Sequence, residues 1–115
     1  MANQKQALTN RLDQGFHALA DATRRAVIAR LAEGETSVSD LAAPFDMALP
    51  SFLQHLRVLE TAGLITTAKQ GRVRTCRLEP GRLAELDRWI TQYEAGWRQR
   101  LDRLGTLLDR KGDTQ

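Results

Sequence analysis

The stretch LPSFLQHLRVLETAGLI, residues 49–65, predicts a helix that ends in a glycine turn and leads into a strand. Pro50 fits only a first helical turn, where its missing N–H has no intrahelical partner, and Gly63 suits a left-handed C-terminal cap. Asp46 is the nearest residue with an oxygen to cap the N-terminus.

At about 100° per residue, the helix over residues 50–62 has two unlike sides. Phe52, Leu56 and Leu59 fall on one side. The opposite side carries Pro50, Ser51, Gln54, Arg57, Val58 and Thr61. The apolar side has to pack on other helices, so we expect the opposite side to face outward.

The flanking sequence predicts further elements around this helix. Apolar spacing indicates helices over residues 5–18 and from Asp21 to Gly34, and Ser37 with Asp40 resembles a capping box that opens a short third helix. Two β-rich runs around Gln70–Arg72 indicate a hairpin, and a long helix follows over residues 80–110.

The predicted fold is mainly α with a small β-hairpin, in the order α-α-α-α-β-β-α. A tight turn between the third and fourth helices makes a helix-turn-helix at about residues 37–62, and the hairpin at about 64–78 is a wing. A chain of 115 residues suits one domain, so we predict a single winged helix-turn-helix domain over residues 1–115.

The residue types on the outward side favour contact with double-stranded DNA. Glutamine can bond adenine in two places, serine can bond several bases, and arginine can bind guanine or a phosphate. The wing segment KQGRVRTCR, residues 69–77, has four basic residues and no acidic one, which suits a nucleic-acid backbone or minor groove. An ordinary solvated surface remains the alternative for each feature. The predicted DNA contacts from these residues are Ser51, Gln54, Arg57, Arg72 and Arg74, and Arg24 and Arg25 are either phosphate contacts or solvated.

The long last helix has more apolar surface than one small domain is expected to cover, and such a surface is typical of a partner interface. The simplest partner is a second copy related by two-fold symmetry, which would place two reading helices about 34 Å apart, or a multiple of that, on a palindromic operator. Apolar residues recur along this helix at a spacing of three and four, with Arg100 as the one gap. The dimer interface predicted from this spacing takes in Leu83, Ile90, Tyr93, Trp97 and Leu104. The alternative is that the helix folds back on its own domain.

Composition narrows the function classes further. The net charge is +3, and the sequence has one cysteine, two histidines, no apolar signal-peptide core and no run long enough to cross a membrane. We therefore expect a cytoplasmic protein with no membrane partner and no disulfide of its own. No paired carboxylates, nucleophile motif or phosphate-binding loop is recognisable, so we do not expect an enzyme or a cofactor.

Four segments together resemble the ArsR/SmtB family of winged helix-turn-helix repressors: LADATRRAVIARLAEGE, VSDLA, HLRVLETAGLI and GRVRTCRLEP. The resemblance covers about residues 14–100. It implies a homodimeric repressor that binds a palindromic operator and is released by a signal, which for this chain could be a small-molecule inducer of unknown identity. It also favours a DNA contact for His55 over a half-buried, internally satisfied histidine. It further implies that Leu8 and Leu12 of the first helix complete the dimer interface.

The chain departs from the family pattern in three places. Ser37 and Ser39 stand where metal-sensing members carry cysteines, and the last helix has no histidine, so we expect no metal site. Cys76 is alone and alternation along its strand turns it inward, which favours a buried thiol over a redox sensor. Leu49 and Leu53 replace polar residues of many relatives, which leaves the operator sequence open. The alternative function is a protein-interaction or small-molecule-sensing dimer on this scaffold with little DNA binding.

Overall fold

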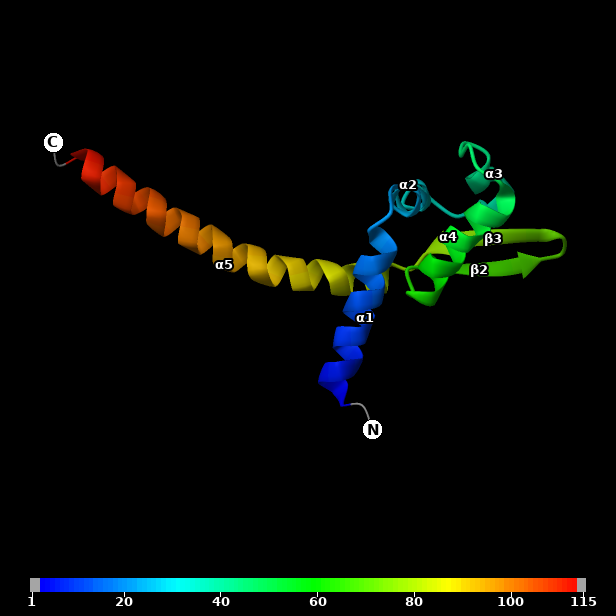
Figure 1. Cartoon of the computed structure of the whole chain (residues 1–115), viewed down its shortest axis with the longest axis horizontal. Coiled ribbons are helices and arrows are strands. Elements are labelled where there is room, and N and C mark those ends of the chain that lie inside the picture. The colour runs from blue at the N-terminus through cyan, green and yellow to red at the C-terminus, as the bar shows by residue number, and fades with distance from the viewer. Residues whose placement is uncertain (1–2, 114–115) are drawn as a thin grey trace. The chain divides into compact units, whose positions relative to one another are not determined.

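The computed structural model describes residues 3–113, with side chains described as far as residue 110. Its elements are α1 (Gln4–Leu19), α2 (Ala22–Leu31), β1 (Thr36–Ser37), α3 (Val38–Ala42), α4 (Leu49–Thr61), β2 (Ile65–Gln70), β3 (Val73–Leu78) and α5 (Pro80–Asp113) (Figure 1). The chain divides into two compact units after Glu85, so that the first turns of α5 belong to the first unit. The second unit is the remainder of one helix and not a second layered fold.

Side-chain caps define the starts of the second and third helices, as predicted. The carboxylate of Asp21 accepts a hydrogen bond from the backbone N–H of Arg24 at 3.2 Å, and the hydroxyl of Ser37 accepts one from the N–H of Asp40 at 3.1 Å. The prediction of Asp46 as the cap of α4 is wrong. The N-cap there is Ala48, which makes no side-chain cap bond, and a proline in the first turn reduces the number of N–H groups that need a partner.

The end of α4 confirms the predicted glycine cap. Gly63 has φ +77°, its N–H donates to the carbonyl of Glu60, and the N–H of Leu64 donates to the carbonyl of Leu59. These two bonds form a Schellman motif, which satisfies carbonyls that the helix leaves free and turns the chain into β2.

The helices and the sheet of the first unit enclose one apolar core. Phe52, Leu56 and Leu59 are buried, so the apolar side of α4 packs inward as predicted. The rings of Phe45 and Phe52 stack with centroids 5.1 Å apart. The other buried apolar side chains of this unit are those of Ala18, Val27, Leu31, Leu41, Ala62, Leu64, Ile65 and Cys76. A large aliphatic or aromatic side chain buried in this way stabilises the fold by about 1.5–3 kcal/mol.

The sheet has three strands, in the order β1–β3–β2, where only the hairpin was predicted. Thr36 pairs with Cys76 and Ser37 pairs with Thr75, both antiparallel. The prediction missed β1 because two residues are too few to show the alternation that identifies a strand. The extra strand fastens the segment that enters α3 to the central strand of the wing.

Candidate DNA-binding surface

The outward side of α4 is open within the first unit. Ser51, Gln54, Arg57 and Thr61 are exposed, whereas Val58 and His55 are half-buried on its flanks. The Schellman turn and the buried side fix the rotation of α4 about its axis, and this rotation puts the predicted contact residues on the surface.

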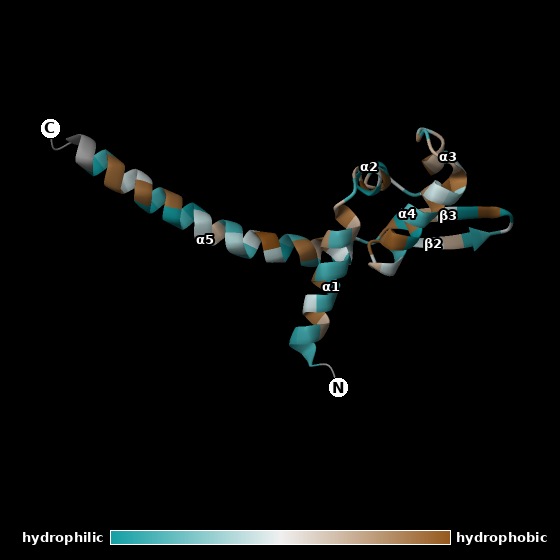
Figure 2. Ribbon diagram, in the orientation of Figure 1, coloured by the Kyte–Doolittle hydropathy of each residue, from teal (hydrophilic) through white to brown (hydrophobic). Residues whose placement is uncertain are grey.

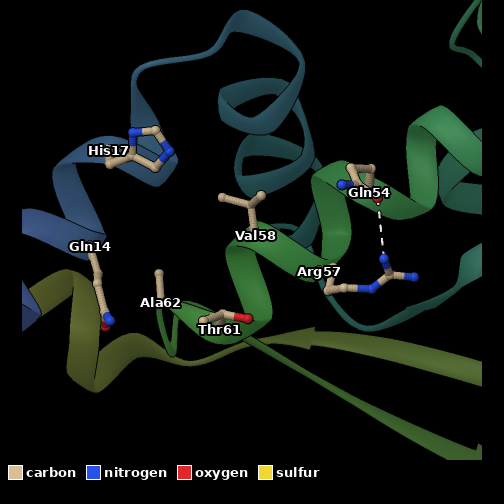
Figure 3. Close-up of a pocket in the computed structure, with 7 residues that line it drawn as sticks. All are labelled: Gln14, His17, Gln54, Arg57, Val58, Thr61 and Ala62. Carbon is tan, nitrogen blue, oxygen red and sulfur yellow. Dashed lines mark hydrogen bonds between the residues drawn. The ribbon is translucent and has the colours of Figure 1, made fainter.

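Gln54 and Arg57 lie one helical turn apart and are joined to each other. The guanidinium of Arg57 donates a hydrogen bond of 3.2 Å to Oε1 of Gln54 (Figure 3). In this contact the oxygen of the Gln54 carboxamide faces Arg57, and its amide nitrogen is directed away from the arginine. Sequence reasoning placed both residues on one side of the helix but did not predict this pairing.

A groove of about 310 Å³ runs between the outward side of α4 and the C-terminal part of α1. Its lining includes Gln14 and His17 from α1, and Gln54, Arg57, Val58, Thr61 and Ala62 from the α4 region (Figure 3). The groove lies directly beside the predicted base-contacting side chains, and no acidic side chain lines it.

Arg24 and Arg25, which were predicted as phosphate contacts or solvated residues, make intramolecular contacts. The guanidinium of Arg24 donates to the carbonyls of Ala18 at 2.6 Å and His17 at 3.1 Å, and that of Arg25 donates to the carbonyl of Leu19 at 2.9 Å. The two side chains therefore cap the C-terminus of α1, where basic groups also interact favourably with the helix dipole.

His55 is connected to the same cluster. Its Nδ1 lies 3.2 Å from a terminal guanidinium nitrogen of Arg24 and 3.7 Å from Oδ2 of Asp21. The side chain of His55 is 24% exposed, so it is half-buried and has an internal partner, yet it is still open to solvent. The pKa of Asp21 is lowered, chiefly by the hydrogen bond from the N–H of Arg24 and further by the nearby His55 and Arg24 side chains.

The wing places like charges opposite each other. Lys69 on β2 is the direct cross-strand partner of Arg74 on β3, and both side chains are exposed. Among the described residues neither forms an ion pair, whereas Arg77 lies 3.4 Å from the carboxylate of Glu79, just outside the basic segment. Like charges directly opposite each other destabilise an antiparallel pair.

The paired charges point to the side of the sheet that bears α4. Thr67 precedes Lys69 by two residues, so their side chains share one face of the strand. The hydroxyl of Thr67 bonds the carboxylate of Glu60 on α4 at 3.2 Å, which identifies that face as the one toward α4. Lys69 and Arg74 extend this face beyond the helix, toward the hairpin tip that carries Arg72.

Cys76 faces inward, as predicted, and is fully buried. Removal from water raises the pKa of its thiol to about 11, with a further contribution from the negative charge of Glu60. The nucleophilic thiolate is therefore scarce at neutral pH. Among the described side chains, which end at residue 110, no group of three or more His, Cys, Asp or Glu is placed to hold a metal ion.

The second unit has a long apolar stripe. The side chains of Trp89, Ile90, Tyr93, Trp97, Leu101, Leu104, Leu107 and Leu108 are each between 42% and 60% exposed. Apolar residues recur along α5 in Figure 2. Arg100, which interrupts the predicted spacing, lies with its guanidinium 5.4 Å from the centroid of the Trp97 ring and so covers part of the stripe. No helix in the part of the chain that the structure describes could span a membrane.

The first unit is thus a winged helix-turn-helix domain with an exposed recognition helix and a basic hairpin. Residues 19–68 match a protein family described as "Helix-turn-helix domain". The "HTH-type transcriptional regulator Rv2034" of Mycobacterium tuberculosis is 39% identical over 101 residues, which are 88% of this chain and 92% of the relative. The crystal structure of an ArsR family transcriptional regulator, RHA00566, is 47% identical with a TM-score of 0.73, over 85% of this chain and 97% of that one.

The chain belongs to the ArsR family of winged helix-turn-helix transcriptional regulators, as its sequence predicted. A more distant solved structure, the "homodimeric winged helix-turn-helix DNA-binding domain" Mb0332 of Mycobacterium bovis, has the same fold. It is 22% identical with a TM-score of 0.63, over 90% of this chain and 93% of that one.

Proposed function

We propose that this protein is a cytoplasmic homodimeric repressor that binds a palindromic DNA operator. In each subunit α4 enters the major groove, where Ser51, Gln54 and Arg57 contact base edges or phosphates, and His55 contacts the DNA at the flank of the helix. Arg72 and Arg74 of the wing contact the sugar-phosphate backbone or the adjacent minor groove.

The observation that carries this proposal is the facing pair Lys69 and Arg74. Two exposed cations are held opposite each other on the face of the sheet toward α4, without a carboxylate among the described residues to neutralise them. Repulsion between the two cations destabilises the free protein. A polyanion bound beside the pair would offset this repulsion. The helix α4, with its exposed polar side, lies on the same face of the sheet as Lys69 and Arg74. One duplex can therefore contact both the helix and the wing.

The apolar stripe of α5 supports the proposal of a dimer. Single exposed apolar residues are ordinary, but a continuous exposed stripe with two tryptophans and a tyrosine is typical of an interface. We propose that Ile90, Tyr93, Trp97 and Leu104 form its centre in a two-fold interface. The apolar spacing adds the half-buried Leu83, and the family resemblance adds the half-buried Leu12 and the 40% exposed Leu8.

Selection of bound duplexes from a random DNA pool tests this function directly. We expect one enriched half-site to recur in inverted orientation, with half-site centres one helical turn apart or a multiple of that. Affinity for the selected duplex should fall steeply with added salt, with a slope of about −0.9 in log K against log salt for each phosphate neutralised. A pool that shows no enrichment, or binding that is insensitive to salt, would contradict the proposal and favour the protein-interaction alternative.

A further inference from the structure

Arg24 connects the end of α1, the start of α2 and the recognition helix α4 through one side chain. Its Nε and one terminal nitrogen donate to carbonyls of α1, and its other terminal nitrogen lies 3.2 Å from Nδ1 of His55. Its backbone N–H is held by the cap carboxylate of Asp21. The guanidinium therefore has little freedom to move away from the imidazole.

This contact determines the tautomer of His55. A guanidinium has five N–H donors and no acceptor, so the short contact requires Nδ1 of the neutral ring to be the acceptor. The single proton of a neutral imidazole then resides on Nε2. Asp21, at 3.7 Å from Nδ1, is too far away to accept a hydrogen bond from that atom and so does not favour the other tautomer.

The protonated nitrogen is accessible. Among the described residues Nε2 of His55 has no hydrogen-bond or ion-pair partner, and the described part of the chain has no buried side-chain nitrogen or oxygen without a partner. Nε2 is therefore exposed to solvent. It belongs to the residue directly after Gln54, on the flank of the surface that is proposed to enter the major groove.

We propose that Arg24 is a positioning residue for DNA binding, which holds His55 in the Nε2–H tautomer so that this neutral donor bonds a phosphate oxygen beside the recognition helix. The inference rests on the proposed DNA-binding function. It assigns to Arg24 an indirect role, through His55, in place of the direct phosphate contact that the sequence allowed. A neutral donor adds a hydrogen bond to the phosphate without adding to the number of counterions released.

The tautomer can be measured without DNA. Long-range 1H–15N correlation spectra distinguish the two neutral tautomers of histidine, and the chain has only two histidines, so His17→Gln assigns the signals. In the free wild-type protein we expect His55 to be in the Nε2–H form at a pH where the ring is neutral. In Arg24→Gln we expect a mixture of both tautomers. A wild-type ring with its proton on Nδ1 overturns the inference.

Replacing His55 with glutamine or with asparagine distinguishes the contributions of its two ring nitrogens to DNA binding. His55→Gln can place an N–H near the position of Nε2, whereas His55→Asn can offer an acceptor to Arg24 near Nδ1 but has no donor at the outer position. We expect DNA affinity to fall roughly tenfold in His55→Asn, because this variant loses a hydrogen bond to a charged phosphate. We expect a much smaller loss in His55→Gln, which keeps a donor at the outer position. Equal losses in the two variants overturn the inference, provided that thermal melting shows both to be folded.

The choice of DNA duplex distinguishes a failure of the phosphate contact from a failure of the proposed DNA-binding function. We would measure both variants on a selected duplex and on a duplex of arbitrary sequence, because phosphates are present in both. The same fold loss on both, with the slope against salt unchanged, supports a neutral phosphate contact. A loss confined to the selected duplex indicates base reading and overturns the inference. If the wild-type protein binds no duplex, the proposed function fails along with the phosphate contact, while the tautomer measurement still decides the role of Arg24 in the free protein.

Discussion

The guanidinium of Arg57 donates a hydrogen bond to Oε1 of Gln54, 3.2 Å away, across one turn of the recognition helix. In this arrangement the pair offers a base edge an array of donors. The oxygen of Gln54 already accepts from Arg57, while its amide nitrogen and the remaining guanidinium N–H groups stay free to donate. Acceptor-rich base edges, such as that of guanine, match such an array.

We therefore expect Gln54→Ala and Arg57→Ala to alter base preference in a coupled way. Each substitution should reduce discrimination at one or two base pairs of the half-site by about 1–3 kcal/mol. The double variant should lose less than the sum of the single losses, because each single change also disturbs the partner. Binding to a panel of single-base operator variants provides the measurement. Strictly additive losses would mean that the two side chains act independently on DNA.

The facing charges of the wing predict opposite effects on stability and on DNA binding. Lys69→Glu replaces a repulsive cross-strand pair with an attractive one, so the free energy of unfolding should rise by about 0.2–1 kcal/mol. DNA affinity should fall for all sequences alike. Lys69→Gln, which removes the repulsion without adding a negative charge, is the matched control and should give smaller changes in the same directions. Thermal melts and salt-dependent binding measure the two effects, and unchanged DNA affinity in both variants would contradict the role of the wing.

Arg72→Ala and Arg74→Ala should weaken binding to every duplex by a similar factor. Each should also reduce the slope of log K against log salt by about one if the side chain neutralises one phosphate. Arg88→Ala is the control, because Arg88 is an exposed arginine on α5 that is assigned no DNA contact. A wing variant that changes sequence preference but leaves the salt slope intact would instead indicate base reading by the wing.

The stripe on α5 predicts a dimer that one charge can disrupt. Leu104→Glu places a carboxylate within an apolar interface, and we expect it to shift the protein to monomers in sedimentation experiments at micromolar concentration. Affinity for the palindrome should fall much more than affinity for a single half-site, because a monomer loses the second contact. Gln99→Glu adds the same charge to the opposite side of the helix and should leave the dimer intact. A Leu104→Glu protein that remains dimeric would place the interface elsewhere.

The buried thiol of Cys76 predicts a specific loss of stability in alkali. Its pKa is raised from about 9.0 to about 11 in the folded protein, so the neutral thiol is favoured by folding. The associated stability is complete below pH 9, where both states bind the proton, and is lost as the pH rises from 9 through 11. A shift of this size corresponds to roughly 2–3 kcal/mol. Urea unfolding from pH 8 to pH 11 should show this decrease in the wild-type protein, over and above that of Cys76→Ala. Equal slopes in the two proteins would contradict the raised pKa.

Most of the fold could be predicted from the sequence because its elements have strong local signals. The three-and-four spacing of Phe52, Leu56 and Leu59 determines which side of α4 is buried, and Gly63 determines where the helix ends. The strand β1 could not be predicted, because its two residues are extended only through pairing with β3, a contact remote in sequence.

The candidate site was likewise predictable only in part. Its composition could be predicted, since helical periodicity alone puts Ser51, Gln54 and Arg57 on one surface. Its internal contacts could not be predicted. Residues 31 apart in sequence meet in the contact between Arg24 and His55, and the pairing of Lys69 with Arg74 depends on the register of the hairpin. Such contacts depend on the tertiary structure, and the local periodicity of one sequence does not show which distant residues meet.

The short strand β1 also limits how this domain can change in length during evolution. Because Thr36 and Ser37 are paired with the central strand of the wing and lead directly into α3, an insertion within these two residues would break that pairing. The hairpin tip beyond Gln70 and Val73 has no such attachment in the sheet. Descendants of this protein that acquire new operators with different groove dimensions are therefore expected to gain or lose residues at the tip, while the segment before α3 keeps its length.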